Sequence, residues 1–295
     1  MYTDRLKIME FKFLIWGGSG WIGSMVCEIL QNQGHTVILA KSRLQDYIGI
    51  CKELEETKPD FVLNAAGITG RPTIDWCEDH KQETYLVNTI GPMNLAHACW
   101  EREQLHMTNF STGCIYTYDE AHPIGTKFKE SDKHNFRGSI YSHSKLRTEK
   151  LLAIYPNVLT LRIRLPIGKD LNPKSLVTKL SKYAKVVNIP NSVTVLPEML
   201  PISIKMAQAK LTGVYNFTNP GAISHNEILA LYKKHINPDF TWNNFTEEEQ
   251  NAILKSKRSN CELDTSKLEA FHPVTEVHEA LDKLLEKLAI KLKTV

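Results

Sequence analysis

The chain has 295 residues, of which 42% are hydrophobic and 23% are charged, as in an ordinary globular protein and unlike a disordered or collagen-like chain. Its net charge of +3, from 36 Lys and Arg against 33 Asp and Glu, argues against a nucleic-acid-binding protein, whose basic residues form a strong patch. The length suffices for one large domain or two ordinary ones, with a core that shelters chemistry from water.

The apolar residues and the cysteines bear on where the protein works. No apolar run approaches the roughly 20 residues that span a bilayer. Residues 1–10 are charged and lack the apolar block of a signal peptide. The six cysteines are scattered without a CxxC pair, which suits free thiols in a reducing compartment. We therefore expect a cytoplasmic protein.

Strand-like and helix-like patterns alternate along the first half of the chain. Strands are predicted at residues 11–16, 36–40, 60–64, 107–111 and 158–164, and helices at 21–33, 45–57, 80–103 and 141–154. This alternation predicts an α/β fold with a Rossmann-type doubly wound parallel sheet covered on both faces. After Pro166 the elements shorten, so we expect a Rossmann domain at 1–165 and a smaller α/β substrate-binding domain at 166–295, with the chain free to cross between them.

A glycine-rich turn follows the first predicted strand. Residues 17–23 have the spacing GxxGxxG and open the next helix. Glycines permit a tight turn and close backbone approach, and the helix N-terminus supplies free N–H groups for a pyrophosphate. A merely structural turn is the alternative, but the place within a βαβ unit favours a dinucleotide site. Its expected members are Gly17, Gly20, Trp21, Ile22 and Gly23.

The loop after the second predicted strand bears on the choice of cofactor. NAD-preferring sites carry a carboxylate here for the ribose hydroxyls, whereas an arginine accommodates a 2′-phosphate. Residues 40–43 read AKSR, and no carboxylate follows until Asp46. We therefore expect NADPH, held in part by Arg43, with NADH as the weaker alternative for the cofactor and a solvated loop as the alternative for Arg43. The same site is expected to be lined by the end of the third predicted strand, Ala65, Ala66 and Gly67.

A Tyr and a Lys four residues apart stand in the helix predicted at 141–154. On a helix Tyr141 and Lys145 share one face, and a neighbouring ammonium lowers the pKa of a tyrosine from its usual value of about 10. Such a tyrosine delivers a proton to a ketone oxygen while hydride arrives at carbon. Alone, YxxxK is often structural, but after a glycine turn it is much more specific. Thr112, at the end of the preceding strand, is expected to share the carbonyl with Tyr141, and Ser111 is the competing candidate.

The glycine turn, the Ser/Thr strand end and YxxxK together resemble the extended short-chain dehydrogenase/reductase family. Residues 62–67 and 75–78 are similar to the dTDP-4-dehydrorhamnose reductases within it. Residues 64–72, 186–192 and 215–227 resemble the bifunctional 3,5-epimerase/4-reductases of UDP-L-rhamnose synthesis, and the similarity spans roughly residues 11–285. The resemblance implies an NADPH-dependent enzyme that acts on a nucleotide-linked 4-keto-6-deoxy sugar.

The resemblance also implies two stages on one substrate, UDP-4-keto-6-deoxyglucose. Carbons 3 and 5 are inverted through enolates, and hydride from NADPH then reduces carbon 4 to give UDP-L-rhamnose. The related GDP-fucose synthases use a cysteine two residues beyond the catalytic Ser/Thr as an acid/base, and Cys114 stands at that position. A thiol beside a cation is a competent proton shuttle. Lys179 is its expected partner by its match to the bifunctional enzymes. An inert strand cysteine and an ordinary surface lysine are the alternatives.

Three further residues are expected to bind substrate. Arg71 and Arg258 are candidates for the diphosphate, because arginine recognises phosphate through two parallel hydrogen bonds. A surface salt bridge is the alternative for Arg71. Asn188, within the similar stretch 186–192, is the third candidate. No metal is expected, since Cys77 and His80 lack further ligands nearby and no HExxH is present.

Other functions remain open at this point. One is a reductase that receives an already epimerised sugar, on a dTDP or a UDP carrier. Another is a non-catalytic NADP-binding regulatory subunit, like that of methionine adenosyltransferase, although an intact set of Tyr141, Lys145 and Thr112 argues against it. Asn88, inside a predicted helix, is interpreted as structural. The expected partner is a nucleotide sugar, without nucleic acid or membrane, and a homodimer is compatible with the sequence.

Overall fold

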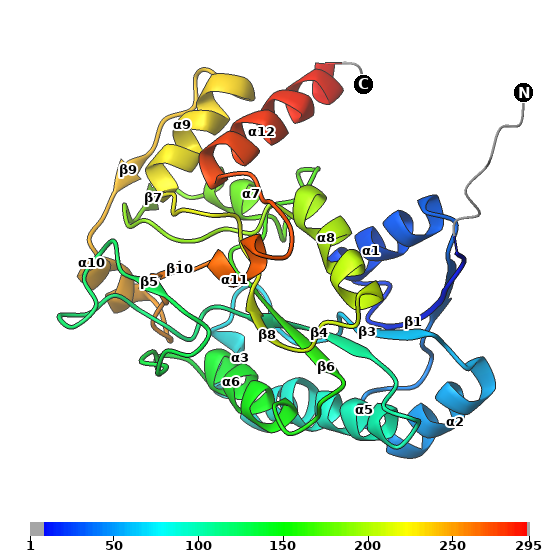
Figure 1. Ribbon diagram of the computed structural model, residues 1–295. Helices are drawn as coiled ribbons and strands as arrows, with labels where there is room; N and C mark the ends of the chain where they lie inside the picture. Colours follow the sequence, from blue (N-terminus) through cyan, green and yellow to red (C-terminus); the bar gives the residue numbers. More distant parts are fainter. Residues whose placement is uncertain (1–8, 294–295) are drawn as a thin grey trace, which may run out of the picture.

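The computed structural model describes residues 9–293 and centres on a six-stranded sheet (Figure 1). Every pair of neighbouring strands in it is parallel. This arrangement confirms the doubly wound parallel sheet of the Rossmann type. In spatial order the strands are β2 (Thr36–Leu39), β1 (Lys12–Trp16), β3 (Phe61–Asn64), β4 (Met107–Thr112), β6 (Val158–Ile163) and β8 (Gly213–Asn216).

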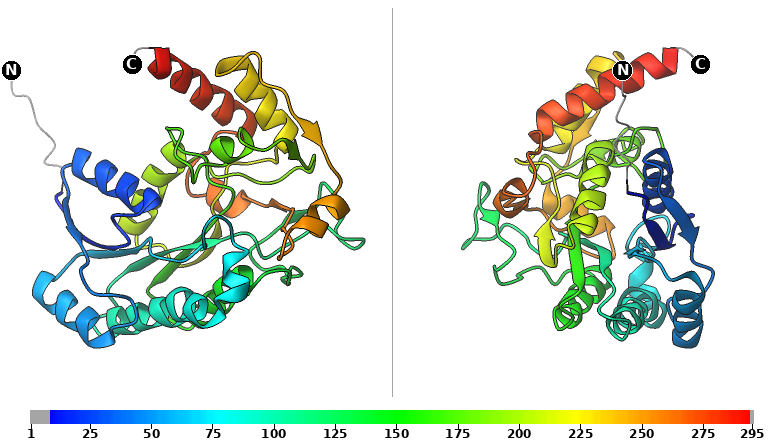
Figure 2. Two further views of the ribbon diagram at one scale, coloured as in Figure 1. Left: turned by 180° about the vertical axis from the view of Figure 1, so that it is seen from behind. Right: turned by 45° about the vertical axis from the view of Figure 1, so that its right-hand side comes forward.

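Helices cover both faces of the sheet (Figures 1 and 2). One face carries α1 (Trp21–Asn32) and α8 (Leu196–Gln208), and the other carries α2 (Tyr47–Thr57), α5 (Gly91–Trp100) and α6 (Ile140–Leu152). Successive residues of β1 alternate between the two cores: Phe13 belongs to the first and Leu14 to the second. Burial on both faces explains why the strands are continuously apolar in sequence.

The strand order reverses direction between β1 and β3. From β1 the chain passes to β2 on one side and later to β3 on the other. Open α/β sheets bind ligands at such a switch point, outside the carboxyl ends of the strands. The glycine turn follows β1 and residues 65–67 follow β3, so the two segments predicted to hold a cofactor meet at this edge.

The long helix predicted at 80–103 is divided into three segments. These are α4 (Lys81–Tyr85), a π-helical turn η1 (Leu86–Ile90) and α5. Asn88 in η1 is fully buried, and its side chain accepts the Ile68 N–H at 2.8 Å and donates to the Ile68 carbonyl at 2.9 Å. A π turn inserts a residue without interrupting the helix, so apolar periodicity does not reveal it; such turns are frequent at functional sites.

The chain beyond residue 165 contributes both to the sheet and to a separate layer. Strand β8 and helix α8 return to the sheet, and a further apolar core, separate from the two on the faces of the sheet, lies in the layer above it in Figure 1. That layer contains α7 (Leu176–Leu180), β7 (Lys185–Val186), α9 (His225–His235), β9 (Asn243–Asn244) and α12 (Val277–Lys293). The remaining elements are α3 (Trp76–Asp79), β5 (Lys127–Phe128), α10 (Glu247–Ile253), β10 (Glu262–Leu263) and α11 (Ser266–Glu269). The division at residue 165 stays a prediction.

Within residues 9–293, no helix combines the length and the apolar character needed to cross a membrane. Residues 1–8, on which the expectation about a signal peptide partly rests, lie outside the described residues.

A buried ion pair connects the sheet to α6. Arg162 of β6 is 1% exposed, and its Nη2 lies 2.6 Å from Oε1 of Glu149. Its Nε donates to Oε2 of the same carboxylate at 2.9 Å. Although burial opposes ionisation, hydrogen bonds from Arg162 and His134 hold the pKa of Glu149 below its ordinary value. The pair therefore remains charged inside the protein.

We predict that Glu149→Gln lowers the free energy of unfolding by about 3–5 kcal/mol, because it leaves a buried guanidinium without its counter-charge. Urea unfolding followed by circular dichroism measures this. The matched control is Glu279→Gln, whose partner Lys283 and own side chain are both exposed, and it should cost less than about 1 kcal/mol. Equal losses in the two variants would contradict the prediction.

Candidate active site

The glycine turn brings the ends of β1 and β3 into contact. Gly17 has a φ of +75°, and a Cβ there would lie 2.5 Å from the Ala66 nitrogen. A Cβ on Gly23 would lie 2.1 Å from the Gly17 oxygen. Both positions therefore require glycine. Gly20 is the N-cap of α1 and has no capping side chain, which leaves the first N–H groups of the helix able to bind an anion.

A groove of about 1220 Å³ runs along this turn. Gly17, Gly20 and residues 65–67 line one part of it, and the exposed Arg43 lines another beyond the end of β2. Trp21 and Ile22 begin α1, so their backbone N–H groups are among those able to bind an anion, and their place in the site stays a prediction. Their side chains pack, partly buried, against the apolar core on the α1 face and lie outside the lining of the groove.

A carboxylate that sequence reasoning missed lies at the end of β2. Glu53 of α2 accepts hydrogen bonds from the Ser42 N–H at 3.0 Å and the Ser42 hydroxyl at 2.6 Å, and a further one from the Lys41 N–H. The motif for a ribose-binding acid covers only the residues that follow the strand directly, whereas α2 supplies Glu53 from 11 residues beyond Ser42. Its oxygens are bound to the loop backbone, while Arg43 lines the groove.

Thr112, at the end of β4, connects two other candidate residues. Its Oγ1 accepts the Cys114 N–H at 3.1 Å, and its side chain lies close enough to that of Tyr141 to influence the pKa of the phenol. Because neighbouring residues of a strand point to opposite faces, Ser111 does not share this position, and the geometry favours Thr112. The Cys114 thiol also acts electrostatically on Tyr141. The phenol, the hydroxyl and the thiol therefore lie on the same side of the sheet.

The ionisation of Tyr141 and Lys145 is governed by burial. Desolvation raises the pKa of Tyr141, and Cys114 adds to the rise while the Thr112 hydroxyl opposes it. The expectation that Lys145 lowers this pKa is wrong for the structure as it stands, because the cost of a buried phenolate dominates. Desolvation lowers the pKa of Lys145 to about 8. The phenol thus stays protonated at neutral pH, as a proton donor must.

Lys145 reaches the edge of the cofactor groove. A Cβ placed on Gly67 would lie 3.0 Å from Nζ of Lys145 and 3.3 Å from Oδ1 of Asn88. Asn88 also approaches the Ser144 hydroxyl at 3.3 Å, so it connects the loop after β3 with α6. This residue, interpreted from the sequence as structural, therefore fixes the distance between the groove and the helix that carries Tyr141 and Lys145.

Arg164 contacts Cys114 and was missed by sequence reasoning. In the pairing of β4 with β6, Thr112 lies opposite Ile163, which places Arg164 beside the residues that follow β4. Nη1 of Arg164 lies 3.3 Å from Sγ of Cys114, and the arginine side chain is 1% exposed. The two residues are 50 positions apart in sequence, so only the register of the two strands reveals the contact.

Lys179 belongs to a second group of residues, in a cleft of about 1120 Å³. The cleft is also lined by Arg71 and Lys174, and by Gly67, which it shares with the cofactor groove. Desolvation, and then the positive charges of Lys174 and Arg258, lower the pKa of Lys179. The two cavities therefore adjoin at Gly67, with positive charge gathered along the cleft.

Arg258 is paired with a carboxylate. Its Nη1 and Nη2 each lie 3.0 Å from one oxygen of Asp75. Burial alone would raise the pKa of Asp75, but hydrogen bonds from Arg258 and Ser256 hold it well below its ordinary range. Glu78, in the same segment, accepts the Ile140 N–H at 2.8 Å at the start of α6. Residues 75–78 thus position both Arg258 and α6, which carries Tyr141 and Lys145. Part of the Arg258 guanidinium is already bound to the Asp75 carboxylate.

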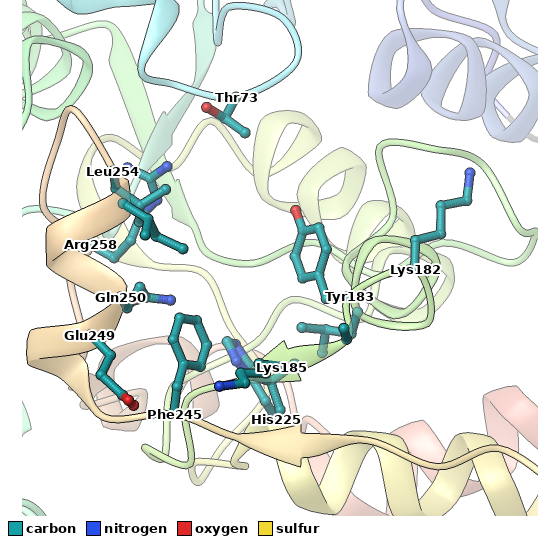
Figure 3. A pocket seen from close by; sticks show the side chains of 14 residues that line it. Thr73, Lys182, Tyr183, Lys185, His225, Phe245, Glu249, Gln250, Leu254 and Arg258 are labelled. Atoms are coloured by element: carbon teal, nitrogen blue, oxygen red, sulfur yellow. The ribbon is translucent and has the colours of Figure 1, made fainter.

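A third cavity, of about 710 Å³, lies beside Arg258 (Figure 3). Phe245, between β9 and α10, and Tyr183, between α7 and β7, extend into it from two sides. Lys182 and Arg258 bring positive charge to its lining. Apolar walls with a few charged groups suit an aromatic base next to phosphates. Asn188, predicted to bind substrate, is exposed and lies outside the lining of these three cavities.

Comparison with known proteins places this geometry in a family. Residues 13–189 match the model described as the NAD dependent epimerase/dehydratase family. The chain is 50% identical over 280 residues to the bifunctional dTDP-4-dehydrorhamnose 3,5-epimerase/dTDP-4-dehydrorhamnose reductase of Arabidopsis thaliana, covering 94% of this chain and 93% of that protein. It is 51% identical over 278 residues to a trifunctional UDP-glucose 4,6-dehydratase/UDP-4-keto-6-deoxy-D-glucose 3,5-epimerase/UDP-4-keto-L-rhamnose-reductase of the same plant, covering 93% of this chain but 41% of that protein.

A solved structure agrees over the whole fold. The L780 UDP-rhamnose synthase of Acanthamoeba polyphaga mimivirus superimposes with a TM-score of 0.90 at 42% sequence identity, covering 95% of this chain and 100% of that one. The family match, the extent of the sequence identity and the shared architecture all point the same way. The chain belongs to the NAD dependent epimerase/dehydratase family, among its nucleotide-sugar 3,5-epimerase/reductase members.

Proposed function

We propose that the protein inverts carbons 3 and 5 of UDP-4-keto-6-deoxyglucose and reduces carbon 4 with NADPH, giving UDP-L-rhamnose. The observation that carries the proposal is the convergence of Tyr141, Thr112 and Cys114 at the end of β4. A simple reductase needs the first two, whereas the thiol adds an acid/base at the same ketone. The names of the relatives, which combine 3,5-epimerase with reductase, support the same function.

The groove along the glycine turn fits NADPH. The turn and the first N–H groups of α1 would hold the pyrophosphate, and Arg43 would hold the 2′-phosphate. Lys145, beside Gly67, would face the inner end of the cofactor. When bound, NADPH supplies the hydride for carbon 4. NADH remains the weaker alternative, because Glu53 is turned toward the backbone of the loop and leaves Arg43 at the groove.

In the epimerisation, Thr112 and Tyr141 hold the carbon 4 oxygen and stabilise the negative charge that develops on it in the enolate. The ketone acidifies the C–H bonds of both neighbouring carbons. Cys114 and Lys179 form the proposed acid/base pair: one removes the proton from one face of the sugar, and the other returns a proton to the opposite face. The lowered pKa of Lys179 suits this role, since only the neutral amine accepts a proton.

In the reduction, Tyr141 gives its proton to the carbon 4 oxygen. Its raised pKa keeps the phenol protonated before the step. The Thr112 hydroxyl, which favours the ionised form of Tyr141, then stabilises the phenolate, and Lys145, one turn later on α6, supplies positive charge at the same edge of the sheet. The proton and the hydride thus reach the two atoms of one carbonyl.

The cleft and the cavity beside it would hold the nucleotide part of the substrate. Arg71, Lys174 and Lys182 line the cleft and suit a diphosphate, and Arg258 contributes charge that Asp75 partly neutralises. The apolar cavity of Figure 3 would take the base. A dTDP carrier is the alternative to UDP, since one relative is named for dTDP. A cytoplasmic location, supported by six free cysteines, and a homodimer also remain proposals.

We predict that the wild-type enzyme, incubated with UDP-4-keto-6-deoxyglucose and NADPH in D₂O, yields UDP-L-rhamnose carrying deuterium at carbons 3 and 5. The Cys114→Ser variant should lose this deuterium incorporation by about 10²-fold or more, because a hydroxyl is a poorer acid/base than a thiol. It should still reduce UDP-4-keto-L-rhamnose supplied already epimerised. NMR of the product sugar measures both outcomes.

The matched control is Cys51→Ser, because Cys51 lies in α2 and lines none of the three cavities. Full deuterium incorporation by Cys114→Ser would exclude Cys114 as the acid/base, whereas a wild-type enzyme that incorporates no deuterium would be a reductase that receives an epimerised sugar. A wild-type enzyme that oxidises no NADPH with either ketone would contradict the proposal outright.

We predict an alkaline decline in the reduction step near pH 8. The pKa of Lys145 is lowered to about 8, so its ammonium is present below that pH and is lost above it, while the raised pKa of Tyr141 keeps the phenol protonated throughout. The rate constant for reduction of UDP-4-keto-L-rhamnose at saturating NADPH, measured from pH 6 to 10, checks this. The Lys145→Arg variant should have a smaller rate constant at neutral pH, and this rate constant should not change between pH 6 and 10. A wild-type rate that stays constant to pH 10 would rule out this role.

A further inference from the structure

The guanidinium of Arg164 is buried among neutral acceptors. Its Nη2 donates to the Ser259 carbonyl at 2.5 Å and to Oδ1 of Asn191, and its Nη1 donates to the Ser259 hydroxyl at 2.9 Å. Nη1 has two further contacts: Sγ of Cys114 at 3.3 Å and the Gly113 carbonyl at 3.5 Å. These anchors fix the guanidinium against the sulfur.

Arg162, two residues earlier on the same strand, shows what is different about Arg164. Both arginines are 1% exposed. Arg162 has a carboxylate counter-charge, Glu149, at 2.6 Å. Among residues 9–293, no carboxylate lies within ion-pair distance of Arg164. A buried charge without a partner is costly, and the group in contact with Arg164 that is able to become an anion is the Cys114 thiol.

The titratable groups that face this pair are neutral at pH 7. Burial raises the pKa of Tyr141 on α6 and of Tyr118 in the loop after β4, and it raises that of Cys261 to about 11. Burial, followed by the charge of Arg164, lowers the pKa of His225 at the start of α9 to about 4. None of these groups neutralises Arg164.

We propose that Arg164 is a positioning residue for the epimerase half of the reaction, which holds the Cys114 sulfur in place and supplies the counter-charge for its thiolate. This inference rests on the proposed acid/base role of Cys114. The thiolate forms when the sulfur gives its proton to the sugar carbon, and it is consumed when the sulfur takes a proton back. Arg164 stays charged throughout: its neutral acceptors hold it while the sulfur is protonated, and the thiolate becomes its counter-charge when the sulfur is ionised.

The test uses the reactivity of Cys114 toward iodoacetamide, since the thiolate is the form that is alkylated. Alkylation of Cys114 and of Cys51 in the same molecule is followed by mass spectrometry from pH 5 to 9. At pH 7, Arg164→Gln should slow the alkylation of Cys114 about tenfold or more, because an opposite charge at this distance has an effect of that size. Arg164→Lys, which keeps the charge, should restore most of the rate, and Cys51 should react equally in all variants.

The matched control is Arg147→Gln, because Arg147 is exposed on α6. The same variants are assayed for deuterium incorporation at carbons 3 and 5 relative to reduction of the epimerised ketone. Arg164→Gln should lower this ratio at least about tenfold. An alkylation profile of Cys114 that is the same in Arg164→Gln and in the wild type would overturn the inference and leave Arg164 as an anchor for Ser259 and Asn191.

A wild-type comparison keeps the inference testable if Arg164→Gln does not fold. In the wild type at pH 7, Cys114 should react about tenfold faster than Cys51, and equal rates would overturn the inference. The alkylation result is independent of turnover. If it is as expected but Cys114→Ser still exchanges deuterium, then the acid/base role of Cys114 fails while the contact between Arg164 and the thiolate stands. If the wild type itself exchanges no deuterium and oxidises no NADPH, the proposed function fails independently of the alkylation result.

Discussion

The parallel pairing of β4 with β6 is the constraint on which the candidate site depends. Because Thr112 lies opposite Ile163, the residues that follow each strand are neighbours, and Cys114 meets Arg164. The same strand end brings Thr112 to Tyr141 on α6. A shift of this register by one residue would turn the strand's side chains to the opposite face. The chemistry therefore depends on a buried sheet whose two cores hold the strands in register.

Exclusion of water sets the charge states at this strand end. Burial keeps the Tyr141 phenol protonated and makes the Lys145 ammonium easier to deprotonate. Beside the Cys114 thiol lies Arg164, whose guanidinium does not lose its proton in proteins. A proton donor, a titrating ammonium and a fixed cation thus lie near one another without neutralising each other. This separation of roles is what a site needs if one ketone is to be enolised and later reduced.

Short sequence motifs predicted those parts of the site whose geometry is set within one turn or one helix. The glycine turn and the pair Tyr141 and Lys145 could be found because each depends on spacing within one turn or one helix. The contacts of Arg164, Asn88 and Glu53 join segments far apart in the chain, so no motif contains them. The pKa of Tyr141 was predicted in the wrong direction because spacing shows a neighbouring charge but not the loss of solvent. Asn188 was predicted from a similar stretch, and its side chain lies outside the lining of the three cavities.

The most direct measurement of the central claim is a crystal structure of the wild-type protein with UDP-4-keto-6-deoxyglucose and NADP⁺, in which reduction cannot proceed. The account predicts that the carbon 4 oxygen lies within hydrogen-bond distance of both Thr112 Oγ1 and Tyr141 Oη, with carbon 3 or carbon 5 facing Cys114 Sγ. A ketone bound away from Thr112 and Tyr141, or a sugar whose carbons 3 and 5 both face away from Cys114, would contradict it.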